Sequence, residues 1–374
     1  MTVYLDYNAT TPVLPEVADL VHKMMVEEFG NAGSRTHEFG GNAKRAVELA
    51  RAQVAAVIKA DKSDVIFTSG ATESNNIAIL GLREFAEKTG KKHIITSKIE
   101  HKAVLEPIAH LEQHGFNVTY LDTTPDGQID TTQLQKSLRE ETILVSIMHI
   151  NNETGVIQPI DEVCRLLNEH DAYFHVDAAQ SFGKYPFTLD NKRIDFISVS
   201  GHKLYAPKGI GALILRRRDY SKPPLKPIFF GGGQEKGLRP GTLATPLIAG
   251  FGLACELATK NADNWFNHVS TLKNNFISAI TEIGAIINGN NTSPYVLNFS
   301  IPGINSEAAM VKLKGVIAVS NGSACTSSNY KPSHVLVAMG MDAERVDGAI
   351  RVSFGACTPI IPYKEIVNRL ETLR

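Results

Sequence analysis

Two short polar segments, each at the end of an apolar run, carry residue types that could do chemistry together. They are residues 175–180 (HVDAAQ) and residues 200–203 (SGHK). Asp177 offers a carboxylate that can face a protonated pyridine nitrogen, and Lys203 offers an amine that can form a Schiff base with an aldehyde. This combination predicts a site for pyridoxal phosphate. The spacing and the neighbours carry the prediction, because lysine alone is usually a surface residue and Asp177 alone could be a strand-end cap.

The neighbours of both residues support this interpretation. Ser200 and His202, which shortly precede Lys203 in the sequence, supply phosphate-ligand groups. Gln180 can donate a hydrogen bond to the phenolic oxygen of the cofactor, while Asp177 keeps the ring nitrogen protonated so that the ring can accept electrons. We therefore predict that one turn contacts both the ring nitrogen and the phenolic oxygen of the cofactor.

The phosphate group needs backbone amides at the start of a helix, and residues 69–76 (SGATESNN) offer them directly after an apolar run. Ala71 and Thr72 are the expected ligands, Thr72 through its hydroxyl. The alternative is a plain helix cap with Glu73 near the positive end of the helix dipole, and the two interpretations are compatible.

Two further polar residues follow apolar runs. His101 could cap a helix, but a flat imidazole can also stack on the cofactor ring and handle protons. Asn152 lies in residues 151–155 (NNETG), which would otherwise indicate a turn. Its amide could reach the cofactor oxygen or a substrate carboxylate.

The elements that must position these residues alternate between strands and helices, which predicts an α/β fold. Expected strands cover residues 65–68, 94–96, 118–120, 143–150, 173–177, 196–199 and 211–215, and amphipathic runs cover residues 43–60 and 133–138. This order predicts a mostly parallel, seven-stranded sheet with helices on both faces. Residues 211–215 follow Lys203 too soon for a helical crossover, so we expect that strand to be antiparallel.

Ligands of open α/β sheets bind beyond the carboxyl ends of the strands. Each candidate follows or ends an expected strand: Thr72, His101, Asn152, Asp177 and Lys203. We therefore expect five strand ends to meet at one crevice.

The pattern changes after residue 245 to a long helical stretch, followed by alternating strands at residues 296–300 and 350–354 and an amphipathic run at residues 363–373. This predicts a connecting helix and a smaller α+β domain with half-buried strands. We expect a large cofactor-binding domain at residues 13–257, and a small domain formed by residues 1–12 and 258–374.

The composition excludes several classes of protein. Among 374 residues, 38 basic and 39 acidic side chains nearly cancel, so no strong average field attracts nucleic acid or anionic lipid. No run approaches the ~20 apolar residues of a membrane span, and no signal peptide is evident, so we expect a cytoplasmic protein without a membrane partner. The four cysteines lack metal-ligand spacing, so we expect no metal, and Cys164 and Cys255 lie in apolar helical patterns typical of a core.

Taken together, the motifs resemble the NifS/IscS-like cysteine desulfurases of the class V aminotransferase superfamily, which are fold-type I pyridoxal phosphate enzymes. The resemblance runs nearly end to end. Besides the stretches around the five strand-end residues, it rests on residues 4–12 (YLDYNATTP), Gly30 with Asn31, Ser34, His37, residues 239–242 (RPGT) and residues 322–327 (GSACTS).

The resemblance implies roles for three more residues. A threonine matching Thr242 reaches the cofactor phosphate of the neighbouring subunit, which implies a homodimer. An arginine matching Arg351 holds the substrate carboxylate, a role suited to the two-donor guanidinium, whereas a surface arginine is the alternative. Cys325 lies among small polar residues, a poor core sequence, and its thiolate would attack the sulfur of cofactor-bound L-cysteine to give a persulfide and alanine. Lys203 would remove the α proton, and His101 is a candidate for proton transfer to the substrate or thiol.

Several alternatives stay open at this stage. A selenocysteine lyase or another class V aminotransferase-like enzyme would use the same cofactor residues, although the cysteine on a polar loop argues against an aminotransferase. The sulfur acceptor could serve iron-sulfur cluster assembly, tRNA thiolation or DNA phosphorothioation. Members serving iron-sulfur scaffolds often extend further than Arg374, so docking to a scaffold is an open question.

Overall fold

A seven-stranded sheet forms the centre of the computed structural model, which describes residues 2–185, 189–218, 221–321 and 332–374. In sheet order the strands are β2 (Val65–Thr68), β8 (Gly211–Leu215), β7 (Phe196–Ser200), β6 (Tyr173–Asp177), β5 (Thr142–Met148), β3 (His93–Ser97) and β4 (Asn117–Leu121). Only β8 runs antiparallel to its neighbours. The expected mostly parallel sheet and its one antiparallel strand are confirmed.

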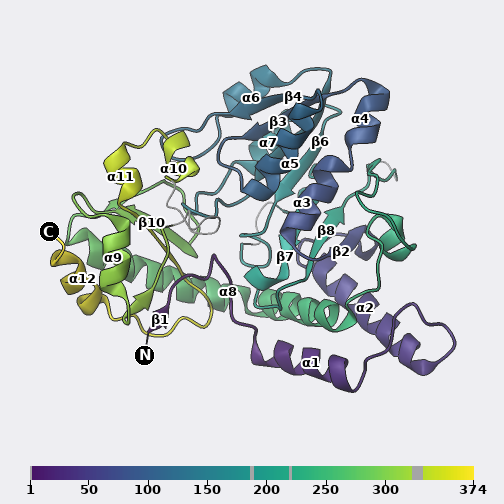
Figure 1. Cartoon of the computed structure of the whole chain (residues 1–374), viewed down its shortest axis with the longest axis horizontal. Coiled ribbons are helices and arrows are strands. Elements are labelled where there is room, and N and C mark those ends of the chain that lie inside the picture. The colour runs from purple at the N-terminus through teal and green to yellow at the C-terminus, as the bar shows by residue number, and fades with distance from the viewer. Residues whose placement is uncertain (1, 186–188, 219–220, 322–331) are drawn as a thin grey trace.

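Helices cover both faces of the sheet, so its strands are largely buried except for the edge strand β4 (Figure 1). The helices are α1 (Pro15–Val26), α2 (Glu38–Ala56), α3 (Ala71–Leu80), α4 (Arg83–Thr89), α5 (Lys102–Gln113), α6 (Thr131–Ser137), α7 (Ile160–Leu166) and α8 (Thr245–Thr281). Alternate strand residues enter two different cores. Phe67 belongs to the core that includes side chains of α1, α2, α6, α7 and α8, whereas Ile66 belongs to the core that includes side chains of α3, α4 and α5. This explains why the strands are nearly continuous apolar runs.

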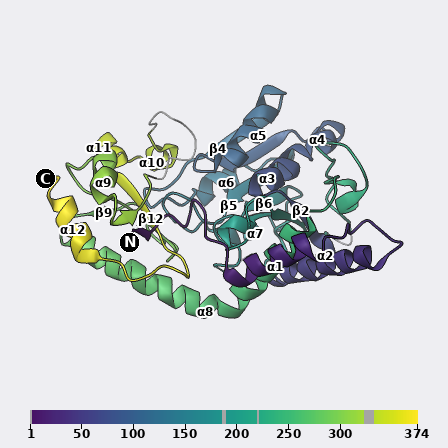
Figure 2. The ribbon, with the colours of Figure 1, turned by 60° about the horizontal axis from the view of Figure 1, so that its bottom comes forward.

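The helix α8 leads from the sheet to a separate apolar core, which we call the second core (Figure 2). That core contains an antiparallel sheet of β12 (Ala349–Ser353), β10 (Val296–Ser300) and β9 (Ile286–Ile287), and a parallel pair of β1 (Val3–Tyr4) and β11 (Ile317–Ala318). Helices α9 (Ser306–Leu313) and α12 (Tyr363–Glu371) pack in this core. Helices α10 (His334–Ala338) and α11 (Ala343–Asp347) instead contribute to a small separate cluster with Ile99 and Ala349. Short 3₁₀ turns lie at Lys62–Asp64, Gly201–Lys203 and Gln234–Gly237.

The expectation that the strands of this second unit are half-buried is wrong. Both β10 and β12 are buried at every position. One face of each strand packs into the second apolar core, and the polar residues of the other face, such as Asn298 and Arg351, hydrogen-bond within the molecule. The alternating pattern therefore marks an apolar and a polar face that are both enclosed. Within the described ranges, no helix has the length and hydropathy needed to cross a membrane.

Candidate active site

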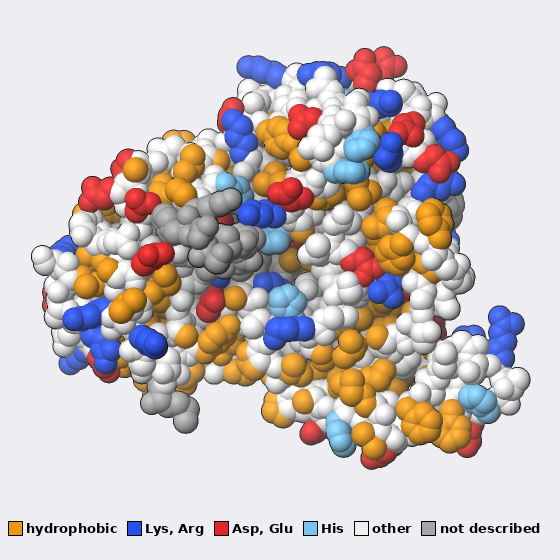
Figure 3. Space-filling view, viewed as in Figure 1, with side chains coloured by type: hydrophobic (Ala, Val, Ile, Leu, Met, Phe, Trp, Pro, Cys, Tyr) orange, Lys and Arg blue, Asp and Glu red, His pale blue; other side chains and the backbone are white. Residues whose placement is uncertain are grey.

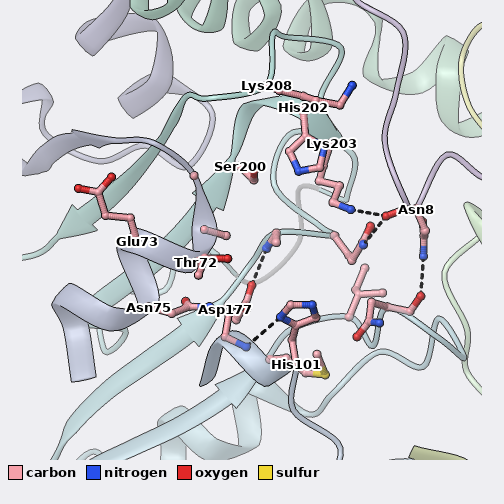
Figure 4. Close-up of a pocket in the computed structure, with 18 of the residues that line it drawn as sticks. Asn8, Thr72, Glu73, Asn75, His101, Asp177, Ser200, His202, Lys203 and Lys208 are labelled. Atoms are coloured by element: carbon pink, nitrogen blue, oxygen red, sulfur yellow. Dashed lines mark hydrogen bonds between the residues drawn. The ribbon is translucent and has the colours of Figure 1, made fainter. Parts of the chain in front are cut away.

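A cavity of about 360 Å³ lies beyond the carboxyl ends of the parallel strands. Its lining includes the five strand-end residues, Thr72, His101, Asn152, Asp177 and Lys203. It also includes Ala71, Gln180, Ser200, His202 and, from the second core, Arg351. The expected convergence is therefore observed. Figure 4 shows how Lys203 and His202 approach from one side of this cavity while His101 and Asp177 approach from the other.

Lys203 lies in the short turn after β7, with its amine directed at the N-terminal segment. The Nζ atom donates to the carbonyl oxygens of Asn8 and, at 2.8 Å, of Ala9. Thr11 in the same segment donates its backbone N–H and its hydroxyl to the His202 carbonyl. The segment before α1 thus holds the lysine turn in place, a contact that reasoning from strand ends did not find.

Asp177 ends β6 and is only 6% exposed. Its Oδ2 atom accepts a hydrogen bond of 2.8 Å from Asn75 Nδ2, and its Oδ1 atom accepts one of 2.9 Å from the Ala179 amide. These two donors fix the direction of the carboxylate. Asn75, in α3, was missed by the sequence reasoning, although a buried asparagine among apolar helix residues is a usable signal.

Gln180 follows in the same turn and is also buried. Its Nε2 atom donates to the Asn8 carbonyl at 3.1 Å. Its Oε1 atom has no hydrogen-bond partner among the described residues. The amide therefore lies beside the lysine turn, and its role toward the cofactor stays a prediction.

The helix α3 presents its N-terminal end to the cavity. Gly70 precedes the helix with φ of +152°, a conformation that favours glycine, and a Cβ built there would lie 3.5 Å from Ser200 Oγ. The amides of Ala71 and Thr72 cannot bond within the helix and so are free to bind an anion. Thr72 lies exposed at the rim of the cavity.

His202 also lines the cavity and is neutral near pH 7. Burial, and then the positive charges of Lys203, Lys208 and Lys184, lower the pKa of His202 to about 4. Its Nδ1 atom lies 3.2 Å from Thr10 Oγ1. Lys208 also lines the cavity and adds a positive charge that the sequence reasoning did not single out.

His101 caps a helix, as one interpretation of the sequence expects, and stacking on the cofactor ring stays a prediction. Its Nδ1 atom accepts a hydrogen bond of 3.1 Å from the Ala103 amide and so caps α5, while its ring lines the cavity. Burial lowers the pKa of His101 below its ordinary value. Because Nδ1 accepts, the proton of the neutral ring lies on Nε2.

Glu100, which precedes His101, is a buried carboxyl that the sequence reasoning missed. It accepts hydrogen bonds from Ser97 Oγ at 2.7 Å and from the Met148 amide at 2.9 Å. Burial, despite these donors, raises the pKa of Glu100 to about 8. The group is therefore mostly protonated near pH 7, and it ties the ends of β3 and β5 together beneath the cavity.

Arg351 enters the cavity from β12 and is 1% exposed, so the surface-arginine alternative is wrong. Its Nη2 atom lies 2.7 Å from Asp6 Oδ1, and Nη1 donates to the Asn152 carbonyl at 3.0 Å. Asn8 Nδ2 donates to the same carbonyl. Arg351 Nε is buried and finds no partner among the described residues. Two of the five guanidinium N–H groups are thus paired within the protein, and a guanidinium fixed in this way suits a carboxylate ligand.

These residues fit pyridoxal phosphate by the chemistry of their donors. The end of α3 with Ser200 and His202 suits a phosphate, the Lys203 amine suits an aldehyde, and the oriented Asp177 carboxylate suits a protonated ring nitrogen. One expected residue is not in this cavity. Thr242 is exposed and does not line it. Cys325 lies outside the described residues, whereas Cys164 and Cys255 are buried as expected.

Comparison with known proteins agrees with this geometry. Residues 3–360 match the family model described as aminotransferase class-V. Over 363 residues the chain is 46% identical to a cysteine desulfurase IscS of Vibrio campbellii, covering 96% of the chain and 89% of that protein. It is 45% identical to a mitochondrial cysteine desulfurase of Arabidopsis thaliana, covering 95% and 79%.

Solved structures show the same architecture. A NifS-like protein superimposes with a TM-score of 0.90 at 37% identity, covering 100% of this chain and 98% of the other. DndA from Streptomyces lividans gives 0.82 at 46% identity, covering 93% and 98%. SspA in complex with cysteine gives 0.83 at 38% identity, covering 96% and 100%. The expected fold of a fold-type I pyridoxal phosphate enzyme is confirmed.

Proposed function

The chain belongs to the aminotransferase class-V family and is a pyridoxal phosphate-dependent cysteine desulfurase, and on this basis we propose which of its residues perform the reaction. The observation that carries the assignment is the convergence of Lys203, Asp177, His101 and Arg351 on one cavity. These side chains come from four separate elements, and each has a separate task in removing sulfur from L-cysteine.

Lys203 and Asp177 serve the carbon chemistry. When bound, pyridoxal phosphate supplies a conjugated ring that accepts the electron pair released from the substrate. Lys203 binds the cofactor, and its amine then takes the proton from the substrate α carbon. Asp177, held by Asn75 and Ala179, keeps the ring nitrogen protonated.

Arg351 and Asn152 orient the substrate. The guanidinium of Arg351 lines the cavity, and its two-donor fork is a good partner for the substrate carboxylate. The Asn152 carbonyl fixes the guanidinium, and the Asn152 side chain lines the same cavity. His101, neutral with its proton on Nε2, is placed to exchange a proton with the substrate or the attacking thiol.

Cys325 accepts the sulfur. Its thiolate attacks the substrate sulfur, so that a sulfur–sulfur bond forms while the carbon–sulfur bond breaks, and the remaining carbon skeleton takes up protons and leaves as alanine. The support is the small, polar sequence around Cys325 and its match to the cysteine desulfurase motif. The persulfide then passes to a protein acceptor, for iron-sulfur cluster assembly, tRNA thiolation or DNA phosphorothioation.

We also propose that the enzyme is a homodimer in which Thr242 reaches the phosphate site of the partner. Two observations support it: Thr242 is exposed outside its own cavity, and large apolar side chains are exposed around α1 and the start of α2. These include Met25, Val26, Phe29 and Phe39, and Figure 3 shows hydrophobic side chains gathered over this part of the molecule. Exposed apolar patches of this kind mark interaction surfaces.

The domain boundaries and the location in the cell are proposals as well. The two apolar cores that cover the large sheet contain residues 17–258, whereas the second core contains residues 3–5 and 269–370. This supports a large domain at residues 13–257 and a small domain at residues 1–12 and 258–374. A cytoplasmic location stays a prediction, since the relatives include a mitochondrial enzyme.

The test compares Cys325 with Cys357, an exposed cysteine. We expect Cys325→Ser to keep the visible absorbance of the bound cofactor but to lose alanine and sulfide release from L-cysteine. Cys357→Ser, a change at an exposed cysteine, is the matched control and should retain activity. Alanine formation at the normal rate by Cys325→Ser would refute the role of this thiol.

A further inference from the structure

An ion pair lies beside the end of the cavity that suits a phosphate. Arg239 Nε lies 2.8 Å from Glu73 Oε1, and Nη2 lies 3.4 Å from Glu73 Oε2. The two side chains are only 25% and 13% exposed, so solvent screens the pair less than an ordinary surface pair. Arg239 does not line the cavity, whereas Glu73 does.

Glu73 is in an unfavourable position for an anion site. It is the third residue of α3, whose first-turn amides are the expected phosphate donors. A carboxylate and a phosphate both favour the positive end of a helix, and two negative charges there repel each other. Glu73 would therefore weaken phosphate binding if its charge were left free.

Two contacts turn the Glu73 carboxylate aside. Its Oε2 atom accepts a hydrogen bond of 2.6 Å from the Ser69 amide, and Arg239 holds both oxygens. Burial alone would raise the pKa of Glu73, but Arg239 and Ser69 together bring it below its ordinary value, so the group is ionised. Figure 4 shows this carboxylate pointing away from Lys203.

Arg239 is itself held by a strained and anchored segment. Glu235 and Lys236 have φ of 44° and 61°, a left-handed conformation that is costly for residues other than glycine. The buried Glu235 carboxylate accepts hydrogen bonds from Arg51 at 2.7 and 2.9 Å and from the Phe67 amide at 2.7 Å. This anchor on α2 and β2 fixes the segment that presents Arg239.

We propose that Arg239 is a positioning residue for cofactor binding, which neutralises Glu73 and holds it away so that the end of α3 can accept the phosphate dianion. This inference rests on the proposed function, because it requires pyridoxal phosphate in the cavity. It predicts that the contribution of Arg239 depends on the charge of Glu73 and on the phosphate of the ligand.

The test is a double-mutant cycle on the apoprotein. We measure the dissociation constants of pyridoxal phosphate and of pyridoxal, which lacks the phosphate, by absorbance titration of Arg239→Gln, Glu73→Gln and the double variant. Arg239→Gln should bind pyridoxal phosphate about tenfold more weakly, the size expected for an unpaired charge a few ångströms away. Its affinity for pyridoxal should not change. Adding Glu73→Gln to Arg239→Gln should restore most of the lost affinity.

Arg83→Gln is the matched control, because Arg83 forms a similar 2.9 Å pair with Glu87 on the exposed surface of α4. It should bind both ligands as the unmodified protein does. The proposal would be overturned if both single variants and the double variant lost the same affinity for pyridoxal phosphate. It would also be overturned if Arg239→Gln lost as much affinity for pyridoxal as for pyridoxal phosphate, since either result would show a merely structural role. If the unmodified protein bound no pyridoxal phosphate, the proposed function itself would fall.

Discussion

Burial determines the charge of several residues around the cavity. Burial keeps Glu100 protonated, with its pKa raised to about 8, and keeps His202 neutral, with its pKa lowered to about 4. Lys184 is fully enclosed, and burial together with Lys203 lowers its pKa to about 7. Glu100 and His202 are therefore mostly uncharged near pH 7, and Lys184 is partly uncharged. Fewer charges around the cavity then need an oppositely charged partner.

His175 gives a pH dependence of stability that can be measured. It is completely buried in β6, and its ring nitrogens lie 2.8 Å from Ser146 Oγ and 2.9 Å from Ser198 Oγ, so it bridges β5, β6 and β7. Burial lowers its pKa to about 4, below the value of about 6.5 in an unfolded chain. As the pH falls from 6.5 to 4, the unfolded state takes up the proton first, and stability is lost.

We therefore expect urea unfolding to show a decreasing free energy of unfolding over this range, with about 3 kcal/mol of the decrease due to His175. His175→Gln should reduce the slope against pH, even though it lowers stability at neutral pH. His22→Asn, at an exposed histidine in α1, should leave the slope unchanged. An unaltered slope in His175→Gln would contradict the assignment of the titration to this residue.

At the scale of elements, the sheet was the most predictable part of the molecule. Each expected strand of the large sheet is present, because near-continuous apolar runs such as that of β5 are typical of buried parallel strands. The end of β5 was misplaced: the pattern continues to Ile150, but the strand ends at Met148. Ile150 instead forms an isolated bridge with Ile157, since the chain turns into the cavity there.

The contacts of the site were harder to predict because they join segments far apart in the sequence. Asn8 lies 195 residues from Lys203, yet its carbonyl accepts a hydrogen bond from that side chain. The local pattern of apolar residues predicts helices and strands, but it does not predict contacts between such distant segments. Asn75 and Glu100 were missed for a related reason: a polar residue within an apolar helix or after a strand signals burial, but its partner is known only once the elements are packed.

At the scale of the whole molecule, α8 connects the large sheet to the second core (Figure 2), and residues from both parts line the cavity. Lys203 follows β7 of the large sheet and Arg351 lies in β12 of the smaller sheet, so the relative position of the two sheets sets the distance between the cofactor and substrate groups. In the proposed dimer, Thr242 of each subunit would also contact the phosphate site of the other subunit.

Mixed dimers can test that contribution. A subunit carrying Lys203→Ala and a subunit carrying Thr242→Ala form, when combined, one site with both changes and one site with neither, provided that Thr242 acts across the dimer. We expect the purified mixed dimer to regain about half of the normal rate of alanine formation, because one intact site of two remains. If Thr242 served its own subunit, every site would carry a change and no gain would follow.

The central claim is that Lys203 is the residue that binds pyridoxal phosphate, at a point where five strand ends meet. Borohydride reduction of the loaded enzyme, followed by proteolysis and mass spectrometry, identifies the modified lysine directly. We predict a phosphopyridoxyl group on Lys203, and none on the same peptide of a Lys203→Ala variant. A label on the neighbouring Lys184 or Lys208 instead, or no label at all, would contradict this claim.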